Sequence, residues 1–384
     1  MSDWETKTLG QCIALQRGYD LTADQRTDGD VPVMGAGGQN GTHGTSKASG
    51  PGVVIGRSGS SFGQVYLSEP DFWPHNTSMY VTDFKGNDKY FTYYLLNNLD
   101  FNRLNSGSAQ PSLNRNYLYP VKVKVPRVNV QVRISSVLRA LDKKIEINNR
   151  INSQLEAMAK TLYDYWFVQF DFPDANGKPY KTSGGIMVYN PTLKREIPEG
   201  WCDQTLCQIA NITMGQSPEG SSFNEESVGT IFYQGSTDFG WLFPTTRQYT
   251  TAPGRMAKKG DILLSVRAPV GDMNIANTDC CIGRGLAALN SKTGSDGFLF
   301  YVMKYFKQIF DRRNSEGTTF GSITKNDLHS LALAYPTADL LKKYDDVVTN
   351  YNKMIFERSL ENRELVMLRD WLLPMLMNGQ VTVK

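Results

Sequence analysis

The chain repeats itself, and this internal duplication restricts its fold more than any other feature of the sequence. Anchors near the start of each copy are 197 residues apart: Trp4, Leu9 and Gly18 match Trp201, Leu206 and Gly215. Anchors near the end are 210 residues apart: Leu113, Leu118 and Pro126 match Ile323, Leu328 and Pro336. The offset only rises between these points, to 200 at Gly29 and 208 at Gly52. A second copy with insertions in its loops explains this rise, and chance matches between glycine-rich stretches are the alternative.

The globular part of each copy reads as a mixed α+β domain with large loops. Residues 53–55 and 262–264 are short apolar runs bounded by glycine, which is typical of buried strands. Residues 121–126 alternate apolar and basic side chains, which predicts a strand with one buried face. The remaining elements are expected as follows: core helices at 90–101 and 298–310, and long turn-rich loops at 35–52 and 215–229.

Each globular part is followed by a heptad pattern that predicts a long helix with an apolar seam. Two positions per heptad form the first seam: Ile134, Leu141, Asn148, Leu155 and Leu162, with Val137, Lys144, Ile151, Met158 and Tyr165. A shift of 210 gives the second seam: Tyr344, Tyr351, Arg358, Leu365 and Leu372, with Val347, Met354, Glu361, Leu368 and Met375. Both seams are polar in the middle, so an antiparallel pair would bring the polar centres together. The alternative is two unrelated amphipathic helices, each packed on its own domain.

These patterns divide the chain into five parts. The expected boundaries are a globular domain at 1–128, a helix at 129–168, a connector at 169–200, a second globular domain at 201–336 and a second helix at 337–379. Turn residues without a sustained period mark the connector. The fold class that follows is α+β, with two tandem strand- and loop-rich domains that contain short helices and are each followed by a long helix. If the two long helices pair as an antiparallel coiled coil, a pseudo-twofold axis relates the two halves.

Composition describes a globular protein, with 40% hydrophobic and 21% charged residues. The sequence offers no secretory leader and no apolar run long enough to span a membrane, so we expect a cytoplasmic protein without membrane contact. The five cysteines are scattered, which suits buried thiols in a reducing compartment: Cys12, Cys202, Cys207, Cys280 and Cys281. Lys and Arg number 12 against 11 Asp and Glu in residues 1–128, and 12 against 14 in residues 196–336. Any phosphate binding must therefore use local patches rather than a general basic field.

The sequence lacks the motifs of an enzyme. It has no G-x-x-x-x-G-K-[ST] phosphate loop and no Asn-Pro-Pro-aromatic motif of amino-methyltransferases. Residues 35–38 resemble part of a glycine-rich cofactor loop, but they lack the third glycine and are better interpreted as a turn. None of the three histidines, His43, His75 and His329, has a second metal ligand at a recognised spacing. We therefore expect no catalytic residue, no metal site and no cofactor bound by this chain.

The loops carry the residue types that base edges and phosphates require, namely Arg, Lys, Asn, Gln, Tyr, His and small hydroxyls. The candidates in the first copy are Arg17, Tyr19, Asn40, His43, Lys47, Arg57, Ser58, Ser60, Arg103 and Asn105. The candidates in the second copy are Gln234, Thr237, Arg247, Tyr249, Arg255, Lys258, Arg267 and Arg284. An ordinary solvated loop has the same composition, so each residue taken singly could also be structural.

The order of domain, helix, domain and helix resembles the specificity subunit of type I restriction–modification systems. Three stretches carry the resemblance: the end of the first helix at 158–172, the opening of the second domain at 197–201, and the end of the second helix at 368–379. The similarity extends over essentially the whole chain. The recognition loops are the variable part of that family and transfer least.

The resemblance implies that each globular part is a target recognition domain for one half of a bipartite sequence in double-stranded DNA. The coiled coil would set the spacer between the halves and dock two methylation subunits, which carry S-adenosylmethionine. Restriction subunits, which use ATP and Mg, would join the complex for cleavage. The specificity chain itself would be non-catalytic.

Two other function classes remain open from the residues alone. One is a bivalent protein that binds ligands other than DNA through two modules on a coiled-coil spacer. The other is a self-contained methyltransferase or nuclease, which the missing motifs disfavour. A sequence-specific gel shift separates the first from a DNA reader, and activity of the purified chain would support the second.

Overall fold

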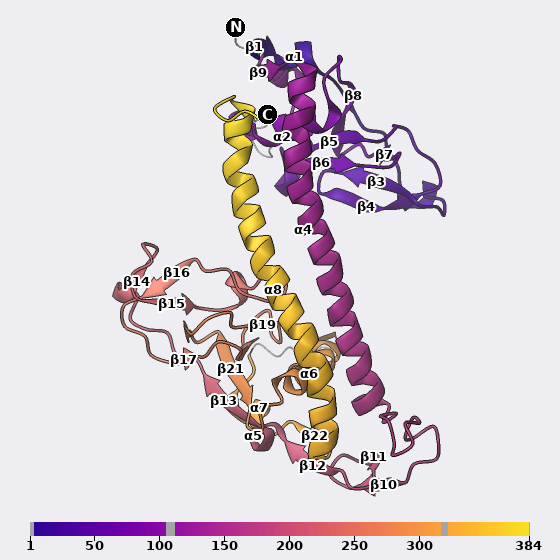
Figure 1. Ribbon diagram of the computed structural model, residues 1–384, viewed down its shortest axis with the longest axis vertical. Coiled ribbons are helices and arrows are strands. Elements are labelled where there is room, and N and C mark those ends of the chain that lie inside the picture. Colours follow the sequence, from indigo (N-terminus) through magenta and orange to yellow (C-terminus); the bar gives the residue numbers. More distant parts are fainter. Residues whose placement is uncertain (1–3, 105–111, 316–321, 384) are drawn as a thin grey trace. The chain divides into compact units, whose positions relative to one another are not determined.

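The computed structural model describes residues 4–104, 112–315 and 322–383. The chain forms two compact units (Figure 1), Met1–Arg150 with Arg358–Lys384, and Ile151–Glu357. Two long helices each contribute residues to both units: α4 spans Val128–Tyr163 and α8 spans Ala338–Met377. Each unit therefore combines one globular part with a section of each helix.

The first unit is built on a four-stranded antiparallel sheet in the order β2-β8-β5-β6. Its strands are β2 (Ala14–Arg17), β5 (Gly52–Gly56), β6 (Val65–Ser68) and β8 (Ser78–Asp83). A second sheet has the order β4-β3-β7, from β3 (Val31–Gly35), β4 (Gly38–His43) and β7 (Trp73–Pro74). The remaining elements are β1 (Trp4–Thr8), α1 (Leu9–Cys12), α2 (Lys89–Asn97), α3 (Arg115–Leu118) and β9 (Lys122–Pro126), of which β1 and β9 pair.

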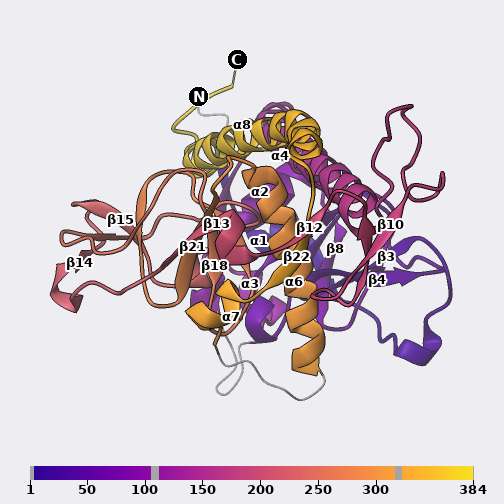
Figure 2. The same ribbon diagram turned by 90° about the horizontal axis from the view of Figure 1, so that it is seen from below.

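The second unit repeats this plan. Its four-stranded sheet has the order β13-β21-β18-β19, from β13 (Ala210–Met214), β18 (Ile262–Ser265), β19 (Met273–Ile275) and β21 (Leu286–Ser291). A five-stranded sheet has the order β14-β16-β15-β20-β17, from β14 (Phe223–Asn224), β15 (Thr230–Tyr233), β16 (Gln248–Thr250), β17 (Met256–Ala257) and β20 (Cys280–Ile282). The others are β12 (Cys202–Thr205), α5 (Leu206–Ile209), α6 (Asp296–Ser315), α7 (Lys325–His329) and β22 (Ala332–Tyr335). Figure 2 shows β14 and β15 apart from β13, β21 and β18.

Matching strand orders confirm that the sequence duplication is a structural one. The parallel pair β3–β7 of the first unit reappears as β15–β20 in the second. The Leu9 N–H donates to the Val121 carbonyl at 2.8 Å, and the Leu206 N–H donates to the Leu331 carbonyl at 2.8 Å. Their offsets, 197 and 210, are those of the sequence anchors. The extra strands β14 and β17 lie in the stretches where the offset rises, as insertions in loops require.

Three local predictions need correction. Residues 35–52 were expected to be a turn-rich loop but contain β4, which forms a hairpin with β3. The connector holds a hairpin of β10 (Met187–Asn190) and β11 (Arg195–Pro198), because the turn residues between them bring two short extended runs together. The first core helix ends at Asn97, four residues before the predicted end, and a separate 3-10 turn begins at Phe101.

Cysteine placement agrees only in part with the expectation of buried thiols. Cys12, Cys280 and Cys281 are buried, and burial raises the pKa of the Cys280 thiol to about 12. Cys202 is exposed and Cys207 is half-buried, so these two depart from the expectation. Within the described residues, no helix is long and apolar enough to cross a membrane.

Of the two heptad positions predicted for the seams of α4 and α8, the structure keeps the first and moves the second by one residue. Ile134, Asn148 and Leu155 are buried, with Leu141 and Leu162 half-buried, at the first predicted position. The second position lies one residue later than predicted. It is occupied by Leu138, Ile145, Asn152 and Ala159 in α4, by Trp166 in the π-helical segment Asp164–Val168 that follows α4, and by Val348, Ile355, Asn362, Arg369 and Leu376 in α8. Of the predicted residues that this shift replaces, Met158 is 52% exposed, Met354 and Leu368 are exposed, and Val347 is half-buried. At the retained position of α8, Arg358, Leu365 and Leu372 are half-buried.

Polar residues of the two helices meet in the first unit. The Asn148 side-chain amide donates to Glu361 Oε2 at 2.8 Å and to Asn362 Oδ1 at 2.9 Å. Lys144 Nζ lies 3.2 Å from the same Glu361 carboxylate. The Asn148 hydrogen bond and then Lys144 hold the pKa of Glu361 below its usual range. A second contact joins Arg369 of α8 to Asp142 of α4 at 3.0 Å. From the first contact to the second, the residue number rises along α8 and falls along α4. The pairing is thus antiparallel, and the predicted meeting of the polar centres is confirmed.

Candidate functional site

A close approach of two backbone segments borders a polar hollow in the first unit. A Cβ at Gly18 would come within 2.2 Å of the His75 carbonyl oxygen, so only glycine lets the end of β2 lie against the β7–β8 loop. The Gly18 N–H donates to the Ser78 carbonyl at 3.0 Å and holds this approach. The hollow beside it has a volume of about 550 Å³ and is lined by side chains that include Arg17, Tyr19, Asp20, Arg57, Asn114 and Arg115.

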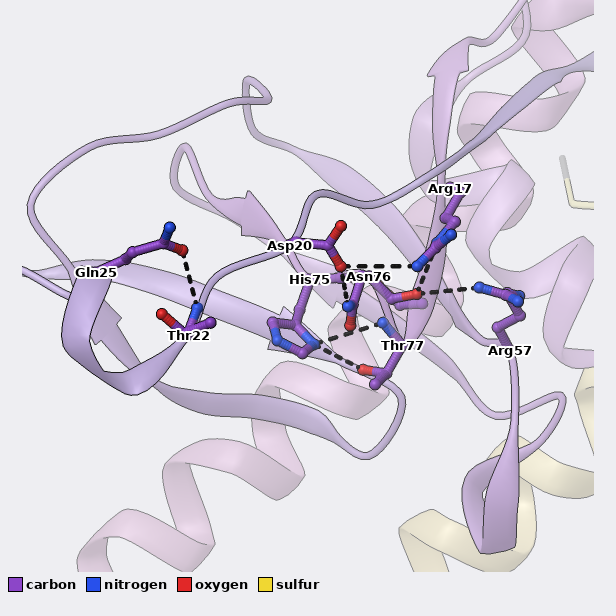
Figure 3. A network of polar contacts seen from close by, with 9 residues as sticks. Arg17, Asp20, Thr22, Gln25, Arg57, His75, Asn76 and Thr77 are labelled. Carbon is purple, nitrogen blue, oxygen red and sulfur yellow. Dashed lines mark hydrogen bonds and ion pairs between the residues drawn. The ribbon is translucent and has the colours of Figure 1, made fainter.

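Two arginines converge on one carbonyl oxygen at this hollow (Figure 3). Arg17 Nε donates to the Asn76 carbonyl at 3.4 Å, and Arg57 Nη1 donates to the same oxygen at 3.3 Å. Asp20 completes the network: its carboxylate lies 3.6 Å from Arg17 Nη2 and accepts a hydrogen bond from the Asn76 side chain. Next to Asn76, the Thr77 hydroxyl lies 3.0 Å from His75 Nδ1. The arrangement can offer several N–H donors and one carboxylate to a single ligand edge.

Sequence reasoning found Arg17 and Arg57 but missed Asp20 and Asn76. Asp20 lies just after the end of β2, and Asn76 lies in the β7–β8 turn, 59 positions from Arg17. The pairing of β2 with β8 brings these distant segments together. The glycine that follows Arg17 and recurs in the second copy was the available indication of a close approach.

His43 and Lys47 both lie against the ring of Trp73 in an aromatic cluster. His43 is buried, its Nδ1 accepts a hydrogen bond from the Thr27 N–H at 3.0 Å, and its ring meets the edge of Trp73 at 5.0 Å. This corrects the expectation that His43 projects from an exposed loop, since β4 turns it inward. Lys47 is exposed, with its ammonium 5.5 Å from the Trp73 ring. Tyr19 packs edge-on against the same Trp73, and its hydroxyl lies 3.2 Å from that of Tyr80.

The other candidates of the first unit are spread over its surface. Asn40 is exposed on β4, and its carbonyl accepts from Arg26 at 2.8 Å. Ser58 forms a β-bridge with Ser112, while Ser60 is exposed in a 3-10 turn. Arg103 is exposed and lies 3.0 Å from Asp100. Asn105 lies outside the described residues.

The second unit has a different polar group at the equivalent place. A Cβ at Gly215 would come within 2.1 Å of the Gly283 carbonyl oxygen, which repeats the approach of Gly18 to His75. Beside it, the Gln234 amide donates to the Ser217 hydroxyl at 2.9 Å, and the Arg284 N–H donates to the same hydroxyl at 3.3 Å. Gln234 and Arg284 are thus brought together, and Ser217 is the member that the sequence did not indicate.

The remaining candidates of the second unit lie apart from this group. Arg247 Nε donates to the buried Asp238 carboxylate at 3.0 Å, so it supports its own loop. Tyr249 is half-buried on β16. The others are exposed: Thr237, Arg255, Lys258 and Arg267. Among the described residues, no cluster of three or more His, Cys, Asp or Glu side chains could hold a metal ion.

Comparison with known proteins gives a consistent set of similarities. The family model described as the type I restriction modification DNA specificity domain matches residues 1–157 and 198–355. The putative type I restriction enzyme MjaX specificity subunit of Methanocaldococcus jannaschii is 30% identical over 334 residues, which cover 83% of this chain and 75% of that protein. The MjaIX specificity subunit of the same organism is 24% identical over 302 residues, covering 73% and 65%.

A solved structure shares the fold. The type I restriction–modification S subunit from M. genitalium superposes with a TM-score of 0.64 at 18% sequence identity. The superposition covers 97% of this chain and 96% of that chain. The family model matches the chain twice in tandem, and each match overlaps one of the two copies found in the sequence.

Proposed function

The chain belongs to the type I restriction–modification DNA specificity family and is a non-catalytic, DNA sequence-specificity subunit, and from this premise we propose that its two globular parts read the two halves of a bipartite target. This proposal is supported by the observation that the two globular parts share one fold but carry different side chains at equivalent positions. Where the first unit has Arg17 and Asp20 beside its close-approach glycine, the second has Met214 and Ser217. Two readers with one fold and different polar groups suit two different half-sites.

The two long helices suit a spacer between the half-sites. A 36-residue helix such as α4 is about 54 Å long at ~1.5 Å of rise per residue. Half-sites one turn of DNA apart are separated by ~34 Å, which a coil of this length can span. Antiparallel helices related by a pseudo-twofold axis would present the two readers in opposite orientations, as the symmetry of duplex DNA allows.

The exposed apolar side chains of the helices suit docking of two methylation subunits. Trp371 is 57% exposed on α8 and lies beside exposed Met367 and Leu368, one turn earlier. A shift of 210 carries Leu368 onto Met158 of α4, which is exposed as well. Exposed large apolar side chains on one face mark interaction surfaces. An exposed apolar residue that recurs in both helices fits two copies of one partner. That partner would carry S-adenosylmethionine, while ATP and Mg would act on restriction subunits.

Replacing Trp371 by alanine tests this docking surface. We expect a loss of at least 10-fold in affinity for a methylation subunit, because exposed tryptophans that become buried dominate interface energies at about 2 kcal/mol or more. Titration calorimetry or native mass spectrometry of the reconstituted complex measures the loss. Trp241→Ala is the matched control, since Trp241 is 53% exposed but lies in a loop of the second unit. Equal losses in the two variants, or no loss in either, would contradict the assignment.

The function as a whole is tested by methylation-sensitive sequencing of a host that carries the chain with its methylation subunit. The expected result is methylation at one bipartite motif, and a gel shift by the reconstituted complex on the same motif. A complex that shifts all duplexes equally, or none, would contradict the proposal and favour the bivalent binding of a ligand other than DNA.

A further inference from the structure

The geometry points to a G·C-reading site in the first unit, in which Arg17 contacts the guanine, Asp20 contacts the paired cytosine, and the Asn76 carbonyl, to which Arg57 also donates, orients Arg17. This inference rests on the proposed function and deepens it by naming the base pair and the residues. It commits to direct reading of bases in the major groove. Contact with the phosphate backbone is the other outcome of the test.

Arg17 is placed as a reader rather than as a structural arginine. Its side chain is 58% exposed, so the outer edge of the guanidinium is open to a ligand. Its inner edge is turned toward the protein, because Nε donates to the Asn76 carbonyl at 3.4 Å and Nη2 faces the Asp20 carboxylate at 3.6 Å. A guanidinium held along one edge presents its other N–H groups in a set direction, which is what bidentate contact with guanine O6 and N7 requires.

The carboxylate of Asp20 makes the site better suited to a base edge than to a phosphate. Its side chain is 76% exposed and lies 3.6 Å from Arg17. A phosphate brought to Arg17 would meet this second negative charge at short range and be repelled. A G·C pair offers the opposite match, since guanine presents two acceptors and the N4 amino group of cytosine presents a donor that a carboxylate accepts. The mixed charge of the site therefore fits one base pair better than it fits the backbone.

The β7–β8 loop that carries Asn76 is anchored by the core of the unit. The His75 N–H donates to the Met34 carbonyl at 2.8 Å, and the buried Ser78 hydroxyl donates to the carbonyls of His75 and Met34 at 2.8 and 3.1 Å. The Asn76 carbonyl, on which Arg17 and Arg57 converge, is thus fixed before DNA arrives. Sites that are held in place in advance lose less conformational freedom on binding.

The second unit supplies an internal comparison. At the positions matching Arg17 and Asp20 it has Met214 and Ser217. The position matching Arg57 is Val266, since the Arg57 N–H donates to Thr77 and the Val266 N–H donates to Gly285 in the same part of the sheet. The pair of arginine and carboxylate is therefore absent from this place in the second unit. Loss of the site should relax one half of the target and leave the other half unchanged.

The experiment uses the chain assembled with its methylation subunits and duplexes in which each position of the methylated motif is changed in turn. Arg17→Ala is expected to lower affinity for the intact motif about 10- to 150-fold and to abolish discrimination at a single G·C position of one half-site. Arg17→Lys keeps the charge but loses the planar fork, so it should lose the same discrimination while general DNA binding persists. Asp20→Asn should relax the same position. Lys7→Ala, which removes a surface charge paired with Glu5, is the control and should leave every position unchanged.

The dependence of binding on salt separates the outcomes. For a base contact, the slope of log K against log salt concentration stays as in the wild type. A slope reduced by about one in Arg17→Ala, with uniform weakening on all duplexes, would identify a phosphate contact and overturn the inference. Unchanged binding in Arg17→Ala and Arg17→Lys would overturn it as well. Both results leave the proposed function intact, which instead fails only if the wild-type complex does not distinguish the motif.

Discussion

Replacing Tyr344 by alanine is expected to lower the free energy of unfolding of the second unit by about 3–5 kcal/mol, the range for removing a large buried ring. Tyr344 is fully buried where α8 meets α4. Its ring lies 5.0 Å from that of Phe167 and 6.0 Å from that of Trp166, and its hydroxyl donates to the Ala159 carbonyl at 3.3 Å. Alanine would remove these contacts at once and leave a cavity at the point that joins both helices to the domain.

One further variant at Tyr344 separates the ring from the hydroxyl, and one at Tyr189 is the control. Tyr344→Phe keeps the ring and removes the hydrogen bond, so it should cost about 0.5–1.5 kcal/mol. Tyr189→Ala removes a 62% exposed ring of β10 and should change stability little. Denaturant unfolding measures the loss, and hydrogen exchange shows whether it is confined to residues 151–357. Tyr344→Ala unfolding at the wild-type denaturant concentration would contradict this account of the core.

The duplication could be predicted from the sequence because it depends on residues that have one physical reason to recur. Gly18 and Gly215 cannot carry a side chain where the backbone of the next loop passes. Leu9 and Leu206 are fully buried at the start of equivalent short helices. Anchors of this kind keep the same spacing in both copies, so their spacing reveals that the fold is duplicated. Loops that read different ligands are free of this constraint, which is where the offset changes.

The second seam position could not be assigned because apolar residues occupy both candidate positions. Met158 and Leu368 are as apolar as a seam requires, but they are exposed, whereas Ala159 and Arg369 lie in the seam. A heptad pattern shows which residues share a face and does not show whether that face meets a helix or a partner protein. Proteins that bind partners through their helices carry both kinds of stripe, and the sequence alone does not separate them.

The polar network of the first unit was beyond sequence reasoning for a different reason. Arg17, Asp20, Arg57 and Asn76 come from the end of β2, the segments that follow β2 and β5, and the β7–β8 turn, which the β2–β8–β5 pairing brings together. No periodicity links such residues, so a list of loop residues contained Arg17 and Arg57 together with Arg103 and His43, which the structure places elsewhere. Strand register is the information that separates them, and it comes from the fold.

Lengthening both helices by one heptad is expected to lengthen the spacer of the DNA target by about three base pairs. Seven residues inserted between Ile145 and Glu146 of α4 and between Glu364 and Leu365 of α8 add ~10 Å of helix, or about three base-pair steps. These points face each other between the Asp142–Arg369 ion pair and the Asn148–Asn362 contact, so both interactions are kept. Each half-site should be unchanged, because neither reader is altered.

Methylation-sensitive sequencing of hosts that carry the wild-type and the lengthened chain measures the two motifs directly. An insertion in α4 alone is the control, since it places unequal lengths opposite each other and should reduce methylation without producing a new spacer. The same spacer in the lengthened chain as in the wild type would show that the helices do not set the distance. A changed half-site would instead show that the helices act on the readers themselves.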